Sequence, residues 1–219
     1  MEPQNVTNLW DERYSQERLS FGDKPNDFLR SQEQLILAGG KRALCLGEGE
    51  GRNAIWLAQL GLDVTAVDLS SVGLRKAAEW ASRLGLTIKT VHADLNTWQF
   101  EPGGWDLIVS IFCHLPADVR ANVHGKVLTG LAVNGLFIAE AYTPSQVKRG
   151  TGGPPDPRLM ATAEQLAHEL EGLHFIEIQE LSRDVTEGHR HTGLADVVQV
   201  VAQNRTKDRL GLPPLLEHC

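Results

Sequence analysis

The chain has 219 residues, of which 42% are hydrophobic, and it carries a formal net charge of −7. This length suits one α/β domain with its own core. The acidic balance and singly scattered lysines and arginines argue against a nucleic-acid binder, and three widely spaced cysteines argue against a disulfide framework or structural zinc. We find no signal peptide and no apolar run of the roughly 20 residues that a membrane helix needs, so we expect a cytoplasmic protein.

Strand-like and helix-like segments alternate from about residue 40 onward. Apolar runs predict five strands, at residues 43–46, 64–67, 88–92, 106–111 and 136–142. Helical periodicity with capping residues predicts helices at residues 53–60, 70–84 and 116–131. This alternation is typical of a mostly parallel sheet.

The last third of the chain has a different pattern. Residues 143–161 are rich in Gly and Pro, and a loop of that length is usually functional or disordered. Thr162 and Gln165 then predict a capping box at the start of a helix. Residues 175–181 and 196–202 read as strands joined by a polar turn, which predicts an antiparallel hairpin at the sheet edge.

We therefore predict a single α/β domain with a Rossmann-like, seven-stranded, mostly parallel sheet, helices on both faces and an antiparallel hairpin at the C-terminal edge. Residues 41–203 form the core in this interpretation. Residues 1–40 form a helical or lid segment, in which Trp10, Tyr14 and Phe21 anchor the segment to the core. Residues 204–219 form a tail.

The central motif is the glycine-rich turn that joins the first strand to the first core helix. Gly47, Gly49 and Gly51 suit a turn with positive φ or a ligand that approaches the backbone closely, although a plain turn uses glycine as freely. Asp68 and Asp94 end the next two strands, and each alone also fits a solvated carboxylate. Together at the carboxyl edge of one sheet, they predict a nucleoside site in which Asp68 accepts ribose hydroxyls and Asp94 receives the adenine amine.

The glycine spacing argues against a dinucleotide. A G-x-G-x-x-G fingerprint would place its last glycine at Arg52, and no G-K-[ST] follows for a phosphate-binding loop. An NAD-dependent oxidoreductase remains the alternative enzyme, and a non-catalytic nucleoside-binding protein is a further alternative.

The sequences ALCLGEGEGRNA, AVDLS and VHADL resemble the first three motifs of class I S-adenosylmethionine-dependent methyltransferases. WDERY, FGDKPNDFL, FCHLP and EGHRHTG resemble the small bacterial tellurite-resistance-type group. The resemblance implies S-adenosylmethionine as the cofactor and S-adenosylhomocysteine as its product. It places the glycine turn beneath the methionine part, Asp68 at the ribose, and Asp94 with Leu95 around the adenine. The neighbouring residues expected to line the same site are Glu48, Asn53, Leu69 and Ser110. The chain departs from the family at Cys45, where the family often has an acidic residue.

Methyl transfer from a sulfonium mainly requires an aligned nucleophile and the exclusion of water, and a base only if the nucleophile carries a proton. His114 follows the fourth strand and His191 lies before the last strand. We predict that both are catalytic and face the acceptor from opposite sides, although His114 also fits a packing role and His191 a solvated turn. His189 and His191 lack a clear third ligand, so no metal is predicted.

The expected partner is a small-molecule acceptor. By resemblance alone, this acceptor is a soft nucleophile such as a thiol, selenium or tellurium species. We expect no nucleic-acid or membrane partner, and a monomer or a homodimer. The glycines in residues 148–157 suit a second lid.

Overall fold

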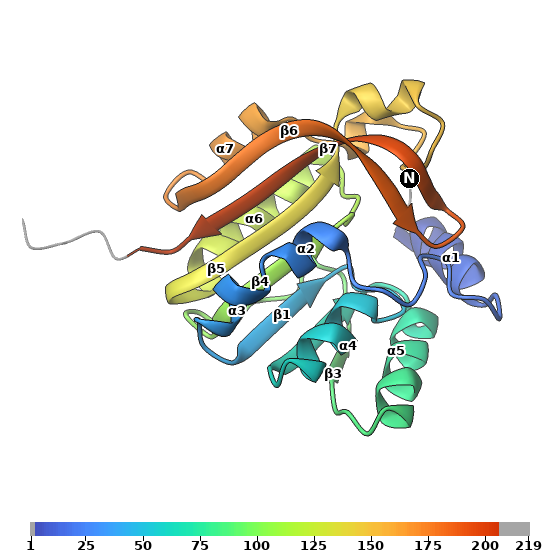
Figure 1. Ribbon diagram of the computed structural model, residues 1–219, viewed down its shortest axis with the longest axis horizontal. Helices are drawn as coiled ribbons and strands as arrows, with labels where there is room; N and C mark the ends of the chain where they lie inside the picture. Colours follow the sequence, from blue (N-terminus) through green and yellow to red (C-terminus); the bar gives the residue numbers. More distant parts are fainter. Residues whose placement is uncertain (1–2, 206–219) are drawn as a thin grey trace, which may run out of the picture.

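The computed structural model describes residues 3–205, and a seven-stranded sheet runs through its centre (Figure 1). The strands are β1 (Arg42–Leu46), β2 (Asp63–Asp68), β3 (Lys89–His92), β4 (Trp105–Ile111), β5 (Leu131–Tyr142), β6 (His174–Glu187) and β7 (His191–Gln203). Their order in the sheet is β3-β2-β1-β4-β5-β7-β6. The first five strands run parallel, whereas β7 is antiparallel to both β5 and β6. The predicted sheet is therefore confirmed. Nearly all of the predicted tail lies outside the described residues.

Helices cover both faces of this sheet. They are α1 (Pro3–Tyr14), α2 (Asp27–Ser31), α3 (Glu33–Leu37), α4 (Arg52–Gln59), α5 (Ser71–Arg83), α6 (Ala117–Gly130) and α7 (Ala163–Glu169), with 3₁₀ turns η1 (Pro144–Lys148) and η2 (Pro157–Leu159). One buried apolar cluster joins α2, α3 and α4 to the sheet, and a second joins α6 and α7 to its other face. Burial on both faces explains the continuous apolar runs in the central strands. None of the described helices is long and apolar enough to cross a bilayer.

Short-range capping fixes where the helices begin. The Ser70 hydroxyl accepts the amide of Gly73 at the start of α5. Thr162 and Gln165 form the predicted capping box at the start of α7. Gly51 precedes α4 with a left-handed φ of 93°, which glycine adopts without strain.

The hairpin at the sheet edge is longer than predicted. Pairing continues through Ser182–Asp196 to Glu187–His191, so His191 is the first residue of β7 and not part of a connection. This part of the ribbon projects past the sheet and is partly solvated, so its strands do not need the apolar run that marks a core strand. The predicted loop of residues 143–161 likewise contains two 3₁₀ turns.

The N-terminal segment lies across the carboxyl edge of the sheet and meets the projecting hairpin (Figure 1). Lys76 Nζ donates to the carbonyls of Tyr14 and Gln16 at 3.1 and 2.8 Å. Farther along, the backbone of Gly22 approaches Gly188 so closely that a Cβ on Gly188 would lie 2.5 Å from Gly22 N. The segment therefore bridges α5 and the hairpin turn.

Candidate functional site

The glycine turn after β1 leaves no room for side chains. Gly47 and Gly49 both have a φ of 60°. A Cβ on Gly47 would lie 2.6 Å from Cys113 Sγ, and one on Gly49 would lie 2.5 Å from Tyr14 Oη. The turn therefore requires glycine for both its backbone conformation and its close contacts.

Asp68 lies beside this turn at the end of β2. One of its carboxylate oxygens accepts the amide of Gly49 at 2.8 Å, and the other accepts the amide of Ser70 at 2.7 Å. No lysine or arginine within residues 3–205 forms an ion pair with it, and burial raises its pKa to about 6. A carboxylate offers about four lone-pair positions, so this one retains the capacity to accept a further hydrogen bond beside those from the backbone amides of Gly49, Leu69 and Ser70.

Glu48 and Asn53 lie beneath the turn. The Glu48 carboxylate accepts the amides of Asn53 and Ala54 at 3.0 and 2.8 Å, which caps the start of α4. Burial raises the pKa of Glu48 to about 7. The fully buried thiol of Cys45 lies next to this carboxylate, and burial raises its pKa well above the ordinary value. Glu48 thus has a structural role, and cofactor contact by Glu48 and Asn53 stays a prediction.

The predicted adenine-binding residues follow β3 on the same edge of the sheet. Asp94 accepts the amide of Asn96 at 2.8 Å. Leu95 is buried, and its carbonyl accepts Lys126 Nζ at 2.8 Å. The lysine also bonds the carbonyls of Asn96 and Trp98, so it holds the backbone after β3 in place.

The two remaining residues predicted to line the cofactor site lie near this edge. The Leu69 carbonyl faces His92 Nε2 at 3.0 Å. Ser110 in β4 pairs with Leu46 in β1, and Leu46 is the residue directly before the glycine turn.

A cluster of rings, which we call the aromatic cluster, occupies the space beyond β4 and β5. It consists of Phe21, Phe112, His114, Tyr142 and His191. The Phe112 ring stacks on Tyr142 at 4.5 Å and meets His191 at 5.0 Å, and the Phe21 ring lies 4.6 Å from His191. Both predicted catalytic histidines contact Tyr142, with ring centroids 5.8 Å away for His114 and 5.4 Å away for His191. Phe112 has an unusual φ of 51°, which marks a constrained backbone.

The aromatic cluster is uncharged at neutral pH. Burial, with a smaller contribution from nearby positive groups, lowers the pKa of His114 to about 4 and that of His191 to about 2. The adjacent Cys113 thiol has a pKa raised to about 12, mainly by burial. Neutral imidazoles of such low basicity are suited to positioning an acceptor rather than to removing a proton from it.

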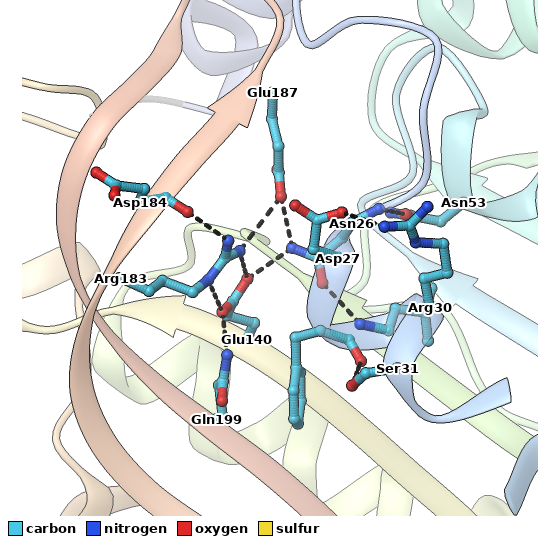
Figure 2. Close-up of polar contacts among 12 residues, drawn as sticks. Asn26, Asp27, Arg30, Ser31, Asn53, Glu140, Arg183, Asp184, Glu187 and Gln199 are labelled. Carbon is cyan, nitrogen blue, oxygen red and sulfur yellow. Dashed lines mark hydrogen bonds and ion pairs between the residues drawn. The ribbon is translucent and has the colours of Figure 1, made fainter. Parts of the chain in front are cut away.

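A buried ionic network ties the N-terminal segment to the hairpin (Figure 2). Arg183 forms a bidentate pair with the fully buried Glu140, at 2.8 and 2.5 Å. Asn26 Nδ2 donates to both Glu140 and Glu187, at 2.6 and 2.7 Å. Arg52, at the start of α4, donates to Glu187 at 2.6 Å. The network therefore connects the helix after the glycine turn to the strand that leads to the hairpin turn.

Sequence reasoning missed this network and the role of Glu50. One oxygen of Glu50 accepts the amide of Ser20 at 2.7 Å, and the other accepts Lys76 Nζ at 2.5 Å. The sequence did offer one signal for Glu50, which is an acidic residue inside the glycine motif. If its carboxylate is buried there, it needs hydrogen-bond or ionic partners. Those partners are far away in the sequence, so the signal could not identify them.

One surface groove lies away from the glycine turn, where Tyr14 and Cys113 already cover the backbone. It has a volume of about 490 Å³ and lies between the loop after η1 and the hairpin turn. Its lining includes Gln146, Thr151, Gly152, Pro155, His189 and Arg190. One lining residue, Gly152, also lies against Tyr142 and His191 of the aromatic cluster.

Comparison with known proteins identifies the central part of the chain: residues 43–135 match the methyltransferase domain family. This match covers less than half of the chain. The matched region begins in β1, includes the glycine turn and Asp68, and ends within β5.

The chain also resembles curated proteins over part of their length. The chain is 31% identical over 124 residues to a protein-L-isoaspartate O-methyltransferase of Xanthomonas campestris pv. campestris, covering 57% of this chain and 55% of that protein. The match to the protein of that name from Stenotrophomonas maltophilia is 31% over 137 residues, covering 60% of this chain and 58% of that protein. The chain thus spans little more than half the length of these relatives.

Solved structures share the fold over most of the chain. TehB from Haemophilus influenzae has a TM-score of 0.68 at 20% identity, covering 91% of this chain and 67% of that one. A chain from work on the conversion of a disulfide bond into a thioacetal group in echinomycin biosynthesis has a TM-score of 0.74 at 19% identity, covering 91% and 93%. The N-methyltransferase NodS from Bradyrhizobium japonicum, solved with S-adenosylhomocysteine, has a TM-score of 0.64 at 15% identity, covering 91% and 98%. At these identities the likeness concerns the fold.

Proposed function

We propose that the protein transfers a methyl group from S-adenosylmethionine to a small-molecule acceptor, and that the acceptor atom is a soft nucleophile such as a thiol, selenium or tellurium species. The observation that carries the proposal is the buried Asp68 carboxylate beside the glycine turn. It is desolvated, has no cationic partner among the described residues and retains hydrogen-bonding capacity. A ribose hydroxyl would supply the missing donor.

The residues of the methyltransferase domain fit this cofactor, which supplies a methyl group activated by a sulfonium. Asp68 would hold the ribose. The turn at Gly47 and Gly49 lets a ligand approach the backbone closely, because neither residue has a side chain. Tyr14 and Cys113 lie against the Cβ positions of these two glycines, so their side chains would border the bound cofactor. The segment containing Asp94 and Leu95 would border the adenine.

The acceptor side supports a nucleophile that needs no strong base. The low pKa values of His114 and His191 make both imidazoles weak bases, and the phenylalanine and tyrosine rings form an apolar, polarisable environment. Catalysis would then rest on alignment in a site without water. Both histidines would position the acceptor.

An acceptor screen that follows S-adenosylhomocysteine release tests the function. It should contain thiols, selenols and tellurium species, together with an isoaspartyl peptide, because the curated relatives are named for that substrate. We expect turnover with at least one soft nucleophile. Cofactor binding without a methylated product from any member of the panel would instead favour a non-catalytic binding protein.

A further inference from the structure

Two buried polar atoms at the edge of the aromatic cluster have no hydrogen-bond partner. They are Tyr142 Oη and His191 Nδ1. Among the side chains of residues 7–205, the only other such atom is Trp105 Nε1, which lies in the core cluster on the α6 face. Native proteins rarely bury polar atoms without partners, because each lost hydrogen bond is costly. Two in one place indicate a site that a ligand completes.

The two side chains lie against each other. Their rings meet edge-on, with centroids 5.4 Å apart and planes at 85°. A Cβ placed on Gly152 would lie 3.0 Å from both Tyr142 Oη and His191 Cδ2. The absence of a side chain at Gly152 therefore lets the loop backbone close over both residues at once.

The groove of about 490 Å³ gives small molecules a route to these two side chains. Gly152 belongs both to the groove lining and to the cover over Tyr142 and His191. Gly152 and Gly153 have φ values of 136° and 88°, and Thr151 secures the loop through hydrogen bonds to Thr192 and Leu194. A shift of these two glycines would connect the groove with the buried atoms. Pockets of this volume accommodate small ligands.

The protonation states define which chemical group fits. Burial raises the pKa of Tyr142, so its phenol keeps its proton and donates a hydrogen bond. The low pKa of His191 leaves a neutral imidazole with one unpaired ring nitrogen. A hydroxyl or thiol complements this pair, because it accepts from the phenol and donates to the imidazole. The rings of Phe112 and Phe21 surround the pair with apolar surface.

We propose that Tyr142 and His191 clamp the heteroatom of the methyl acceptor, and that the acceptor enters through the groove beside Gly152. The acceptor class is a thiol carried on a small apolar, preferably aromatic, body, for which an alcohol of the same shape is a stable binding probe. This inference rests on the proposed function, because it assigns the acceptor side of the same site. The sequence analysis did not place Tyr142 in the site. For His191, the proposal specifies Nδ1 as the atom that contacts the acceptor.

The test uses benzyl alcohol and toluene as probes, which differ in the hydroxyl that the clamp would hold. Each is titrated into the full-length protein, with and without S-adenosylhomocysteine. We expect the parent to bind benzyl alcohol about tenfold or more tightly than toluene, as one or two buried hydrogen bonds allow. Tyr142→Phe should remove most of this preference and leave toluene binding unchanged. Its melting temperature should not fall, because the lost hydroxyl has no partner in the protein.

His191 and Trp105 provide the matched variants. His191→Asn keeps a polar group near the position of Nδ1 and should retain most of the preference, whereas His191→Leu should lose it. Trp105→Phe removes the other unpartnered polar atom and should leave the preference intact.

Unchanged benzyl alcohol affinity in Tyr142→Phe, or no binding of either probe, would overturn the clamp. Failure to bind S-adenosylhomocysteine would instead contradict the proposed function. The probe titrations done in the absence of S-adenosylhomocysteine would still test whether Tyr142 and His191 hold the heteroatom.

Discussion

Buried carboxylates occur in two regions of the molecule, and their partners differ. Glu140 and Glu187, near the hairpin, are neutralised by Arg183 and Arg52. Asp68 and Glu48, beside the glycine turn, form no ion pair among the described residues: Asp68 accepts backbone amides, and Glu48 accepts backbone amides and the Cys45 thiol. Burial accordingly raises the pKa of Asp68 to about 6 and that of Glu48 to about 7.

The presence or absence of a cationic partner distinguishes carboxylates that hold the fold together from Asp68, which we assign to ligand binding. The ionic network uses its charges to hold three distant segments together, so breaking it should damage the fold. Asp68 is instead held in a state that costs stability and leaves a lone pair free, which is the expected property of a group that awaits a ligand. The charges around a buried carboxylate are thus more informative than its burial alone.

The largest effect should follow a side chain placed in the glycine turn. Gly49→Val should abolish S-adenosylmethionine binding, because its φ is 60° and its Cβ would lie 2.5 Å from Tyr14 Oη. Calorimetric titration measures the loss, which we expect to exceed about 100-fold. Gly85→Val is the matched control, because Gly85 has a φ of 70° but open space around its Cβ position. Normal binding by Gly49→Val would show that the turn does not approach the cofactor.

Breaking the ionic network should reduce stability. Arg183→Met leaves Glu140 buried without its cation and should lower the free energy of unfolding by about 3–5 kcal/mol. Denaturant titration measures this loss. Arg158→Met removes the exposed pair with Asp156 and should change stability little. Equal losses in the two variants would mean that the buried network is no more important than a surface pair.

Removing the charge of Asp68 should stabilise the ligand-free protein in a pH-dependent way. The folded pKa of about 6 lies above the ordinary value of 3.8, so the folded state binds more protons between these two pH values and the Asp68 contribution to stability is lost as pH rises. Asp68→Asn should therefore match the parent below about pH 4 and become more stable as pH rises through 6. The gain should reach about 3 kcal/mol, since each pKa unit corresponds to about 1.4 kcal/mol.

The quantity to measure is the difference in free energy of unfolding between Asp68→Asn and the parent, because His114 and His191 change the stability of both proteins in the opposite sense. Their lowered folded pKa values make stability rise with pH in the same range. A constant difference between Asp68→Asn and the parent from pH 4 to 8 would contradict the raised pKa of Asp68.

The smallest effect concerns the two histidines. His114→Ala and His191→Ala should leave cofactor affinity unchanged and lower turnover, by about tenfold if each only positions the acceptor. The parental rate should show no histidine titration between about pH 5 and 8, because both pKa values lie below that range. A loss of 10²–10⁴-fold with an inflection near pH 6.5 would instead indicate a general base.

Local sequence determined the glycine turn more fully than it determined the hairpin. Residues 43–46 form an apolar run that ends in closely spaced glycines, so strand, turn and helix can all be read from neighbouring residues. Strand β6 continues through Arg183 to Glu187, where charged side chains hide the pairing. Its partners, Asn26 and Glu140, are too distant in the sequence for any spacing rule to connect them. Tyr142 was missed because its significance lies in a partner that it lacks.

Titration of the protein with S-adenosylmethionine, S-adenosylhomocysteine and NAD at pH 7, alongside Asp68→Ala, tests the central claim most directly. We expect both adenosyl ligands to bind and NAD to give no response. Asp68→Ala should weaken adenosyl binding by roughly 10–150-fold, the range for hydrogen bonds to a charged group of about 1.5–3 kcal/mol. Asp63→Ala, at the exposed start of β2, should bind as the parent does. Tight NAD binding without a response to either adenosyl ligand, or parental affinity in a folded Asp68→Ala protein, would contradict the assignment of this site.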